Sequence, residues 1–321
     1  MSDTSLKLQA LRLPNNPILY PNLPGLEGEL GANINGPSLI RVPDWIENPL
    51  GRYYLYFAHH SGKFIRLAYS NDIEDSWTVY SPGTLHIDQI DQTVCVNHIA
   101  SPDVHVDHQN REIRMYFHGV HPWQGQVTFL TISKDGLHWA VSPEVLGPFY
   151  MRVFQYDGWY YAIAKNKNIG GVILRSKDGV TPFERGVDFI PNMRHAAVLL
   201  KEDTLIVFYS QIGDTPESIL MSYVDLTQDW TSWIPSEPIL ILKPEQDYEG
   251  VDLPIQPSQS GAAKGRVRQL RDPAVYQEDN KSYLLYSIAG ESGIAVAELK
   301  SIILTLIKAK SAFLKQLISK L

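Results

Sequence analysis

The chain has 321 residues, of which 44% are hydrophobic and 20% charged, so it can bury a large core and has the composition of an ordinary soluble globular protein. Its net charge of −7 argues against nucleic acid or an anionic membrane as the main partner. A single cysteine, Cys95, excludes an intrachain disulfide and a cysteine-based metal site. Because the first residues carry no apolar run like that of a secretory signal, we expect a cytoplasmic protein; a form whose signal has been removed is the alternative.

Residues 1–35 are rich in Pro, Asn and Gly and predict an irregular lead-in. From residue 36 to residue 299 one pattern occurs five times: an aliphatic entry strand, a turn, an aromatic-rich strand, another turn and a third strand. The aromatic-rich strands are expected at 52–57, 113–117, 158–163, 204–209 and 282–287. Short strands repeating every 40–50 residues or so are typical of propellers. The sequence therefore predicts an all-β fold, a single five-bladed β-propeller.

The first strand of each propeller blade faces a common central funnel, so residues at the five entries should meet there. These entries begin near Gly36, Ser101, Tyr150, Arg194 and Arg271. A second signal follows late in the first four blades, where an Asp in a short polar turn precedes an aromatic residue. We interpret those aspartates as structural, because Asp favours the backbone of hairpin turns.

Two insertions interrupt the repeat, and long insertions in repeat folds are frequently functional loops. Residues 84–100 include His98, and residues 236–270 include Tyr248, Glu249 and Asp252. The tail, residues 300–321, carries five Lys and no acid, with apolar residues at helical spacing. It predicts an amphipathic helix that docks on the propeller or joins copies of the chain. It is too short and too charged to span a membrane, and a membrane-surface helix is the alternative.

The candidate catalytic residues are carboxylates, because glycosidic bonds are usually hydrolysed between two of them. Asp103 and Asp272 each lie at the start of a first strand, where a structural cap is the competing interpretation. Arg271 would keep Asp272 ionised or clamp a substrate. Glu249, beside Tyr248, is the candidate general acid, and an exposed loop carboxylate is the alternative.

The candidate substrate-binding residues are polar side chains near the same entries. They are Asn35, His98, Arg194, His195, Asp252 and Arg271. The histidine spacings match no known metal-ligand motif, so we expect neither a metal nor another cofactor. Nucleophile-elbow, phosphate-loop and zincin motifs are absent from the sequence.

These motifs and their order give the chain a resemblance to the five-bladed β-propeller glycoside hydrolases of family 43 and its relatives in families 32, 117 and 130. The resemblance covers residues 35–299 and rests on Gly36-Pro37-Ser38, Ser101-Pro102-Asp103-Val104 and Arg271-Asp272-Pro273. It implies that Asp103 matches the residue that tunes the acid in family 43. Gly36 and Phe149 occupy the positions of that family's base and acid, and the histidine acid of some relatives gives His195 a second possible role.

The leading functional hypothesis is a glycoside hydrolase that acts on a short oligosaccharide, with inversion implied by the resemblance. Asp103 and Asp272 would serve as base or modulator and Glu249 as acid. A non-catalytic carbohydrate-binding propeller is the first alternative. A phosphorylase is the second, with phosphate held by Arg194, Arg271 and either Arg266 or Arg268. A protein-interaction scaffold is the third.

Overall fold

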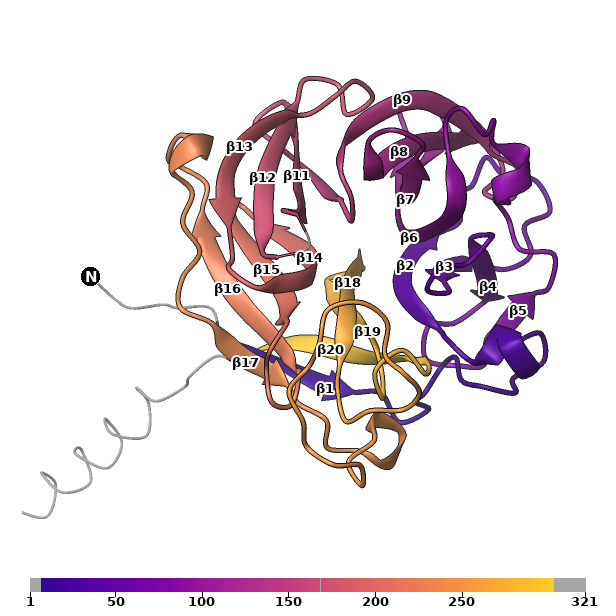
Figure 1. Cartoon of the computed structure of the whole chain (residues 1–321), viewed down its shortest axis with the longest axis vertical. Helices are drawn as coiled ribbons and strands as arrows, with labels where there is room; N and C mark the ends of the chain where they lie inside the picture. Colours follow the sequence, from indigo (N-terminus) through magenta and orange to yellow (C-terminus); the bar gives the residue numbers. More distant parts are fainter. Residues whose placement is uncertain (1–6, 168, 303–321) are drawn as a thin grey trace, which may run out of the picture.

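The computed structural model describes residues 7–302 except residue 168, and these residues form five four-stranded antiparallel sheets. The sheets are arranged as blades around a common centre, with β2, β6, β14 and β18 nearest the middle (Figure 1). The predicted all-β fold and the number of blades are therefore confirmed.

The first three blades follow chain order from the innermost to the outermost strand. Their strands are β2 (Asn35–Arg41), β3 (Tyr53–Ala58), β4 (Arg66–Ser70), β5 (Thr78–Tyr80); β6 (Val96–Asp107), β7 (Glu112–His121), β8 (Gly125–Ser133), β9 (Ala140–Pro148); and β10 (Arg152–Tyr156), β11 (Trp159–Lys165), β12 (Gly171–Ser176), β13 (Glu184–Phe189).

The fourth blade has the same order, whereas the fifth takes its outermost strand from the beginning of the chain. Their strands are β14 (Met193–Lys201), β15 (Thr204–Gln211), β16 (Ile219–Asp225), β17 (Ile239–Leu242); and β18 (Arg271–Glu278), β19 (Lys281–Ser287), β20 (Ile294–Ile302), β1 (Lys7–Arg12).

The aromatic-rich strands are the second strands of the blades, as the sequence predicts. Every residue of β3 is buried, because neighbouring blades pack against both of its faces. Two tyrosines of these strands also join successive blades: the Tyr56 hydroxyl donates to the Gly136 carbonyl and the Tyr116 hydroxyl to the Gly179 carbonyl, both at 2.9 Å. The aromatic residues thus fill the space between blades and satisfy their own polar atoms there.

The aspartates that follow the third strands are structural, as expected. Asp135 accepts from the backbone amides of Leu137 and His138 at 2.8 and 2.9 Å. Asp178 accepts in the same way from Val180 and Thr181. Each carboxylate therefore closes its own turn and stays outside the central region.

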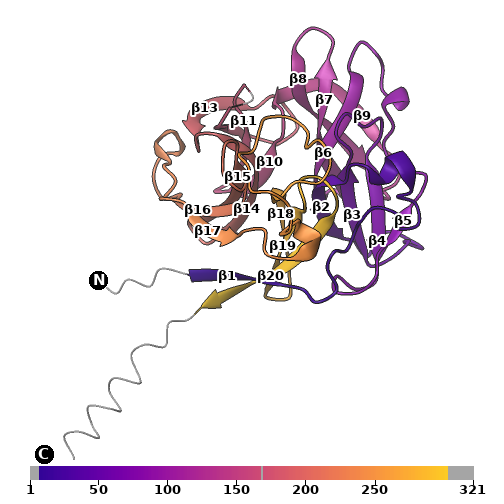
Figure 2. The same ribbon diagram turned by 60° about the horizontal axis from the view of Figure 1, so that its bottom comes forward.

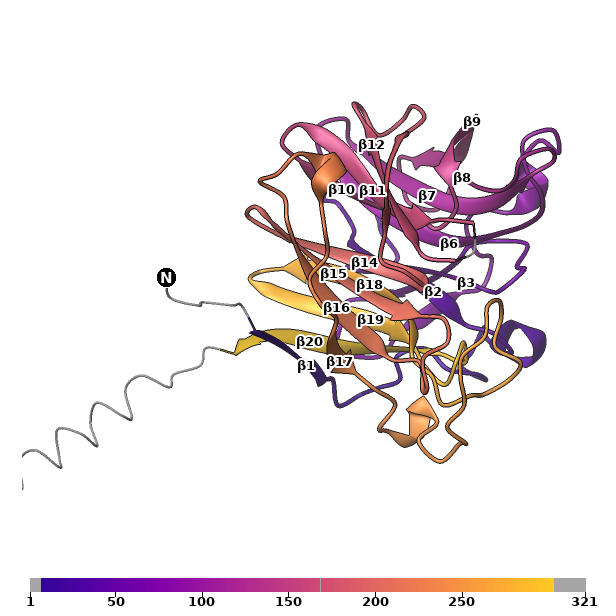
Figure 3. The same cartoon turned by 60° about the vertical axis from the view of Figure 1, so that its left-hand side comes forward.

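The predicted irregular lead-in includes one strand that the sequence did not reveal. Residues 7–12 form β1, which pairs antiparallel with β20 from Lys7 opposite Ile302 to Arg12 opposite Ala297. Figures 2 and 3 show these two strands side by side at the edge of the molecule. Arg12, at the end of β1, also donates to Glu249 at 2.8 Å. Glu249 belongs to the insertion between blades four and five, so this contact joins the insertion to β1. The predicted helical tail, apart from its first residues in β20, lies outside the described residues, as does the contact between copies expected from it.

The remaining regular structure consists of single turns. The described residues contain four short 3₁₀ helices and no α-helix: η1 (Gly28–Gly31), η2 (Ile87–Gln89), η3 (Trp230–Ser232) and η4 (Asp247–Glu249). In this part of the chain, no helix has the length and hydrophobicity needed to cross a bilayer.

Candidate active site

The strand register places one residue of each blade at the same level of the central funnel. In three blades an inner strand pairs with its neighbour, skips two residues at a bulge and then resumes pairing. Blade four has a similar bulge between Met193 and Ala196, so it can be aligned with these three blades. Blade three can be aligned as well, because the Lys165 amide donates to the Phe149 carbonyl at the corresponding place. The five equivalent entry positions are Gly36, Ser101, Tyr150, Arg194 and Asp272.

Four of these entry positions have left-handed backbone. The φ angles are 60° at Gly36, 50° at Ser101, 59° at Tyr150 and 47° at Asp272. Such angles are uncommon for residues other than glycine, and their recurrence turns the chain sharply as it enters each inner strand. The turn brings the side chains of neighbouring entry residues to one end of the propeller axis.

A cavity of about 230 Å³, here called the funnel, lies at that end. It is lined by three of the entry residues (Ser101, Tyr150 and Arg194), by residues of the second strands and by two residues of the insertion between blades four and five. Its charged and titratable lining residues are His60, His98, His118, Tyr150, Lys165, Arg194, His195 and Glu291. Among the described residues, no group of three His, Cys, Asp or Glu side chains is arranged to hold a metal ion.

The most distinctive pair of the funnel joins His195 of β14 to Asp272 of β18. Nδ1 of His195 contacts one carboxylate oxygen of Asp272, and the Ser287 hydroxyl donates to the other at 3.1 Å. Burial favours a higher pKa for Asp272, but His195 and two nearby arginines hold that pKa well below its ordinary value. Burial lowers the pKa of His195, although Asp272 opposes this effect.

The other nitrogen of His195, Nε2, is buried and makes no hydrogen bond to any described residue. The Tyr150 ring lies edge-on to the imidazole, with ring centroids 4.3 Å apart. A neutral imidazole whose Nδ1–H is held by a carboxylate presents a bare Nε2, which can accept a proton from a bound molecule.

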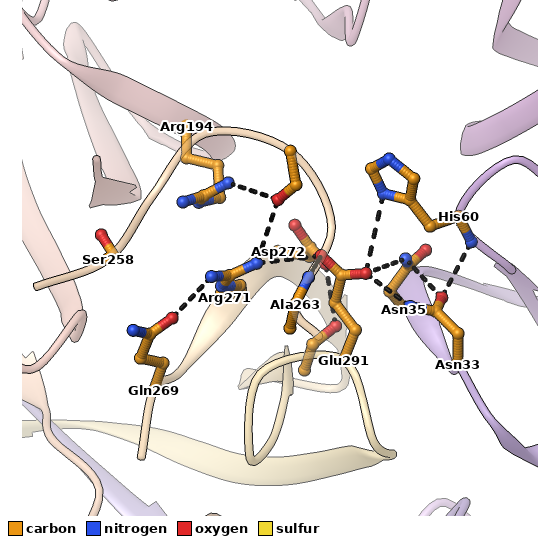
Figure 4. A network of polar contacts seen from close by, with 12 residues as sticks. Asn33, Asn35, His60, Arg194, Ser258, Ala263, Gln269, Arg271, Asp272 and Glu291 are labelled. Carbon is orange, nitrogen blue, oxygen red and sulfur yellow. Dashed lines mark hydrogen bonds and ion pairs between the residues drawn. The ribbon is translucent and has the colours of Figure 1, made fainter. Parts of the chain in front are cut away.

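A second carboxylate, Glu291, lies in the connection between β19 and β20 and faces the funnel (Figure 4). Its Oε1 accepts from Arg271 at 3.0 Å. Its Oε2 accepts from Asn33 at 2.6 Å and from Asn35 at 3.3 Å, and Nδ1 of His60 lies 3.6 Å away. The funnel therefore has two imidazoles each beside a carboxylate, His195 with Asp272 and His60 with Glu291.

Behind the funnel wall, Glu217 joins two arginines. Its Oε1 accepts from Arg194 at 2.6 Å and from Ser210 at 2.7 Å, and its Oε2 lies 3.1 Å from Nε of Arg271. The Glu217 side chain is fully buried, and the two guanidinium groups are nearly so. This chain of charges connects blades four and five at the level of the entry positions.

Both arginines also hold the insertion in place over the funnel. Arg194 and Arg271 both donate to the Gly261 carbonyl, at 3.1 and 3.3 Å (Figure 4). Arg194 also donates to the carbonyl of Gln259. Ser258 fastens the same segment, since it accepts from the Gly213 amide at 3.0 Å. These guanidinium groups are thus committed to protein acceptors.

Lys165 is the remaining cation of the funnel. It ends β11 and is only 4% exposed. The described residues give its ammonium no hydrogen bond or ion pair within 4 Å. Burial, together with Arg194, lowers the pKa of Lys165 to about 8, while Glu217 and Asp272 act in the opposite direction.

The structure brings together six of the nine predicted site residues. Asn35, His98, Arg194 and His195 line the funnel, and Asp272 and Arg271 lie directly behind its wall. The three that lie elsewhere are Asp103, Glu249 and Asp252.

Asp103 lies one level deeper along the axis. In the register of β6 it is equivalent to Ala274 of β18, whereas Ser101 is equivalent to Asp272. Asp103 lines a separate cavity of about 790 Å³ at the opposite end of the inner strands. There it accepts from His105 at 2.9 Å and from the Val153 amide at 2.8 Å.

Glu249 and Asp252 belong to the insertion but do not line the funnel. Glu249 is fully buried in η4 and accepts from Arg12 at 2.8 and 2.9 Å and from the Tyr286 hydroxyl at 2.9 Å. Two backbone amides also donate to it. Asp252 is exposed. In this structure Glu249 holds the insertion to the closing strand β1.

Comparison with solved structures confirms the resemblance at the level of the fold. A structure from glycoside hydrolase family 130 aligns with a TM-score of 0.66 and 12% identity, over 93% of this chain and 95% of its own. A glycosyl hydrolase from Bacteroides ovatus gives a TM-score of 0.64 and 12% identity, over 93% and 95% of the two chains. A family 43 enzyme from Xanthomonas citri complexed with xylose gives 0.56 and 11%, over 85% and 87%. The protein therefore has the five-bladed propeller fold of these glycoside hydrolases.

A closer relative comes from a virus. Uncharacterized protein R118 of Acanthamoeba polyphaga mimivirus is 36% identical over 327 aligned residues, which cover 91% of each chain. The present chain belongs to the same family as this mimivirus protein. No established protein-family model matches it.

Proposed function

We propose that this protein is a glycosidase that cleaves a terminal sugar from a short oligosaccharide in the funnel. The observation that carries the proposal is the His195–Asp272 pair: Nε2 of His195 has no hydrogen-bond partner among the described residues, and His195 lines the cavity at the entries of the inner strands. The fold supports it, because the similar solved structures include glycoside hydrolases of families 43 and 130.

The size of the funnel indicates what it can accept. Its volume of about 230 Å³ lies below the range of roughly 300–1,000 Å³ found for sites that enclose drug-sized ligands. One sugar ring fits such a space, and the rest of an oligosaccharide would lie outside it. This arrangement favours release of single terminal sugars over cleavage within a chain.

The charge states assign a role to the pair. Asp272 stays ionised, because its pKa is depressed, and it orients the imidazole. His195 is neutral at pH 7, because its pKa is lowered, so Nε2 can take a proton from an attacking water. A carboxylate beside an imidazole thus performs the proton transfer for which family 43 uses an Asp at the position of Gly36.

The test is turnover on a panel of aryl glycosides and oligosaccharides, measured with and without inorganic phosphate. We expect phosphate-independent release of single sugars, and we expect Asp272→Asn to lower kcat by about 10²–10⁴-fold, the usual contribution of a positioned base. Asp252→Asn is the matched control, since this carboxylate is exposed and outside the funnel. Equal activity of the two variants would remove His195 and Asp272 from the mechanism.

A carbohydrate-binding propeller without catalysis is the second candidate. It is favoured by the engagement of the funnel carboxylates: Glu291 accepts from three side chains, and Asp272 contacts both His195 and Ser287. In that case sugars would raise the Tm of the protein without being cleaved.

Phosphorolysis has less support. Arg194 and Arg271 already bind protein acceptors, and Arg266 and Arg268 donate to backbone carbonyls outside the funnel. Turnover that required added phosphate would favour phosphorolysis over hydrolysis.

A further inference from the structure

We propose that Lys165 is the general acid of the funnel and protonates the departing oxygen of the glycosidic bond. This inference rests on the proposed function, and it supplies the partner that His195 needs. Hydrolysis requires one group that gives a proton to the leaving oxygen and another that takes one from water.

The Lys165 ammonium lacks a protein partner among the described residues. The residue is 4% exposed, its side chain lines the funnel, and the described residues leave its Nζ without a hydrogen bond or ion pair. A lysine that is almost buried and whose ammonium has no protein partner is retained where a bound molecule completes its interactions. The arginines nearby differ, because protein acceptors satisfy them.

Lys165 also lies at a place in its blade that faces the funnel in a neighbouring blade. Lys165 pairs with Phe149 just before the bulge of its blade. Asn35 pairs with Ala58 and Ala100 with His118 at the same place in blades one and two. Lys165 is therefore equivalent to His118. His118 lines the funnel from that position in blade two, and Lys165 does so from blade three. His195 enters from blade four, so the two proton-transfer groups come from adjacent blades.

Lys165 and His195 have complementary protonation states at neutral pH. A pKa of about 8 leaves most Lys165 molecules protonated at pH 7, whereas His195, with its lowered pKa, is neutral. The charged groups that act on Lys165 are Arg194 of β14, Glu217 before β16 and Asp272 of β18. At pH 7 one group therefore carries a proton that it can give, and the other has a nitrogen that can accept one.

The reaction then balances as follows. A water oxygen forms a bond to the anomeric carbon, and one water proton moves to Nε2 of His195. The bond from the anomeric carbon to the glycosidic oxygen breaks, and its electron pair goes to that oxygen. The oxygen takes a proton from Nζ of Lys165. The imidazolium releases its proton and the amine recovers one from solvent, so the enzyme returns to its starting state.

The decisive experiment compares leaving groups. For the sugar that the full-length protein releases, kcat is measured on the dinitrophenyl glycoside and on the methyl glycoside, with Lys165→Met and Lys165→Arg. We expect both variants to lose about 10²–10⁴-fold on the methyl glycoside and much less on the dinitrophenyl glycoside, whose oxygen departs without a proton. Lys201→Met, at an exposed lysine of β14, is the control.

Each other outcome has a definite meaning. Equal losses on the two glycosides would overturn the acid role and leave Lys165 as a binding residue. Full activity of Lys165→Arg would show that only its charge matters, which also overturns the proposal. No turnover of any glycoside by the unmodified protein would refute the proposed function itself, and the acid role with it.

A second measurement does not depend on turnover or on the folding of a variant. The rate at which trace acetic anhydride acetylates the Lys165 amine is followed against pH in the intact protein, with the modified peptide quantified by mass spectrometry. We expect the rate to rise with a midpoint of about 8. A midpoint near the ordinary value of 10.5 would overturn the proposal.

Discussion

Replacing Glu217 by Gln should destabilise the propeller strongly while changing almost no volume. The carboxylate lies between Arg194 and Arg271 and is fully buried. An arginine cannot lose its proton inside a protein, so removal of the negative charge leaves two buried guanidinium groups to be compensated. Arg271 would still pair with Glu291 at 3.0 Å, but Arg194 would keep only the carbonyls of Gly261 and Gln259.

The magnitude follows from the cost of breaking a buried ion pair on one side, which is about 3–5 kcal/mol. The entropy of unfolding near the midpoint is about 2.1 cal/mol/K per residue, so a chain of 321 residues has about 0.7 kcal/mol/K. The expected decrease in Tm is therefore about 4–7 °C.

Differential scanning calorimetry at one scan rate measures this change. Glu144→Gln serves as the control, because Glu144 is exposed on β9 and forms no ion pair among the described residues. We expect the control to unfold within about 1 °C of the unmodified protein, as surface substitutions usually do. A Glu217→Gln protein that behaved like the control would refute the view that this carboxylate holds blades four and five together.

Two further predictions concern the loss of stability at acidic pH and a substitution at the entry position Gly36. Burial lowers the pKa of His98 and of His118 below the ordinary value of 6.5, so the unfolded chain binds protons first as the pH falls. Their contribution to the free energy of unfolding should be complete above about pH 6.5 and should diminish below it; urea titrations between pH 7.5 and 5 test this, and His118→Gln should flatten the dependence. Gly36→Asp should be tolerated, because a Cβ there meets no atom nearer than 3.5 Å and because Ser101 and Asp272 adopt the same backbone region. Its cost of about 1 kcal/mol should lower the Tm by no more than about 3 °C, and a fall above 6 °C would contradict the alignment of entry positions.

The blades could be predicted from the sequence because each second strand carries a local signal. An aromatic-rich run with turn residues at both ends indicates a buried strand without knowledge of the rest of the chain. The strand β1 has no such signal, since its burial alternates irregularly and its partner β20 lies almost 300 positions away. Pairing over that distance depends on closure of the whole ring.

The site was predictable only in part, because its residues come from two kinds of position. Residues of the entries, such as His195 and Asp272, could be found from the repeat. Lys165 ends β11 and His118 lies three residues before the end of β7, and a repeat alignment that included these second-strand positions would have indicated them. Glu291 lies in a short connection with no repeating signal.

Asp103 and Glu249 were misplaced for different reasons. Asp103 and Asp272 both stand beside Pro near the start of a strand, but one precedes the Pro and the other follows it. At these bulges a shift of two residues moves a side chain from the level of the funnel to the next level along the axis, where it lines the other cavity. The role of Glu249 is set by Arg12, a contact that no local pattern records.

The pairing of β1 with β20 also has a consequence for synthesis of the chain. β1 is synthesised before every strand of the first four blades, and its partner β20 is synthesised after all of them. Blades one to four can form as hairpins while translation continues, but β1 has no strand to join until β20 has been made. Formation of the funnel entry provided by Asp272 belongs to this last blade. The funnel should therefore be completed only when β20 has been made and β1 can pair with it.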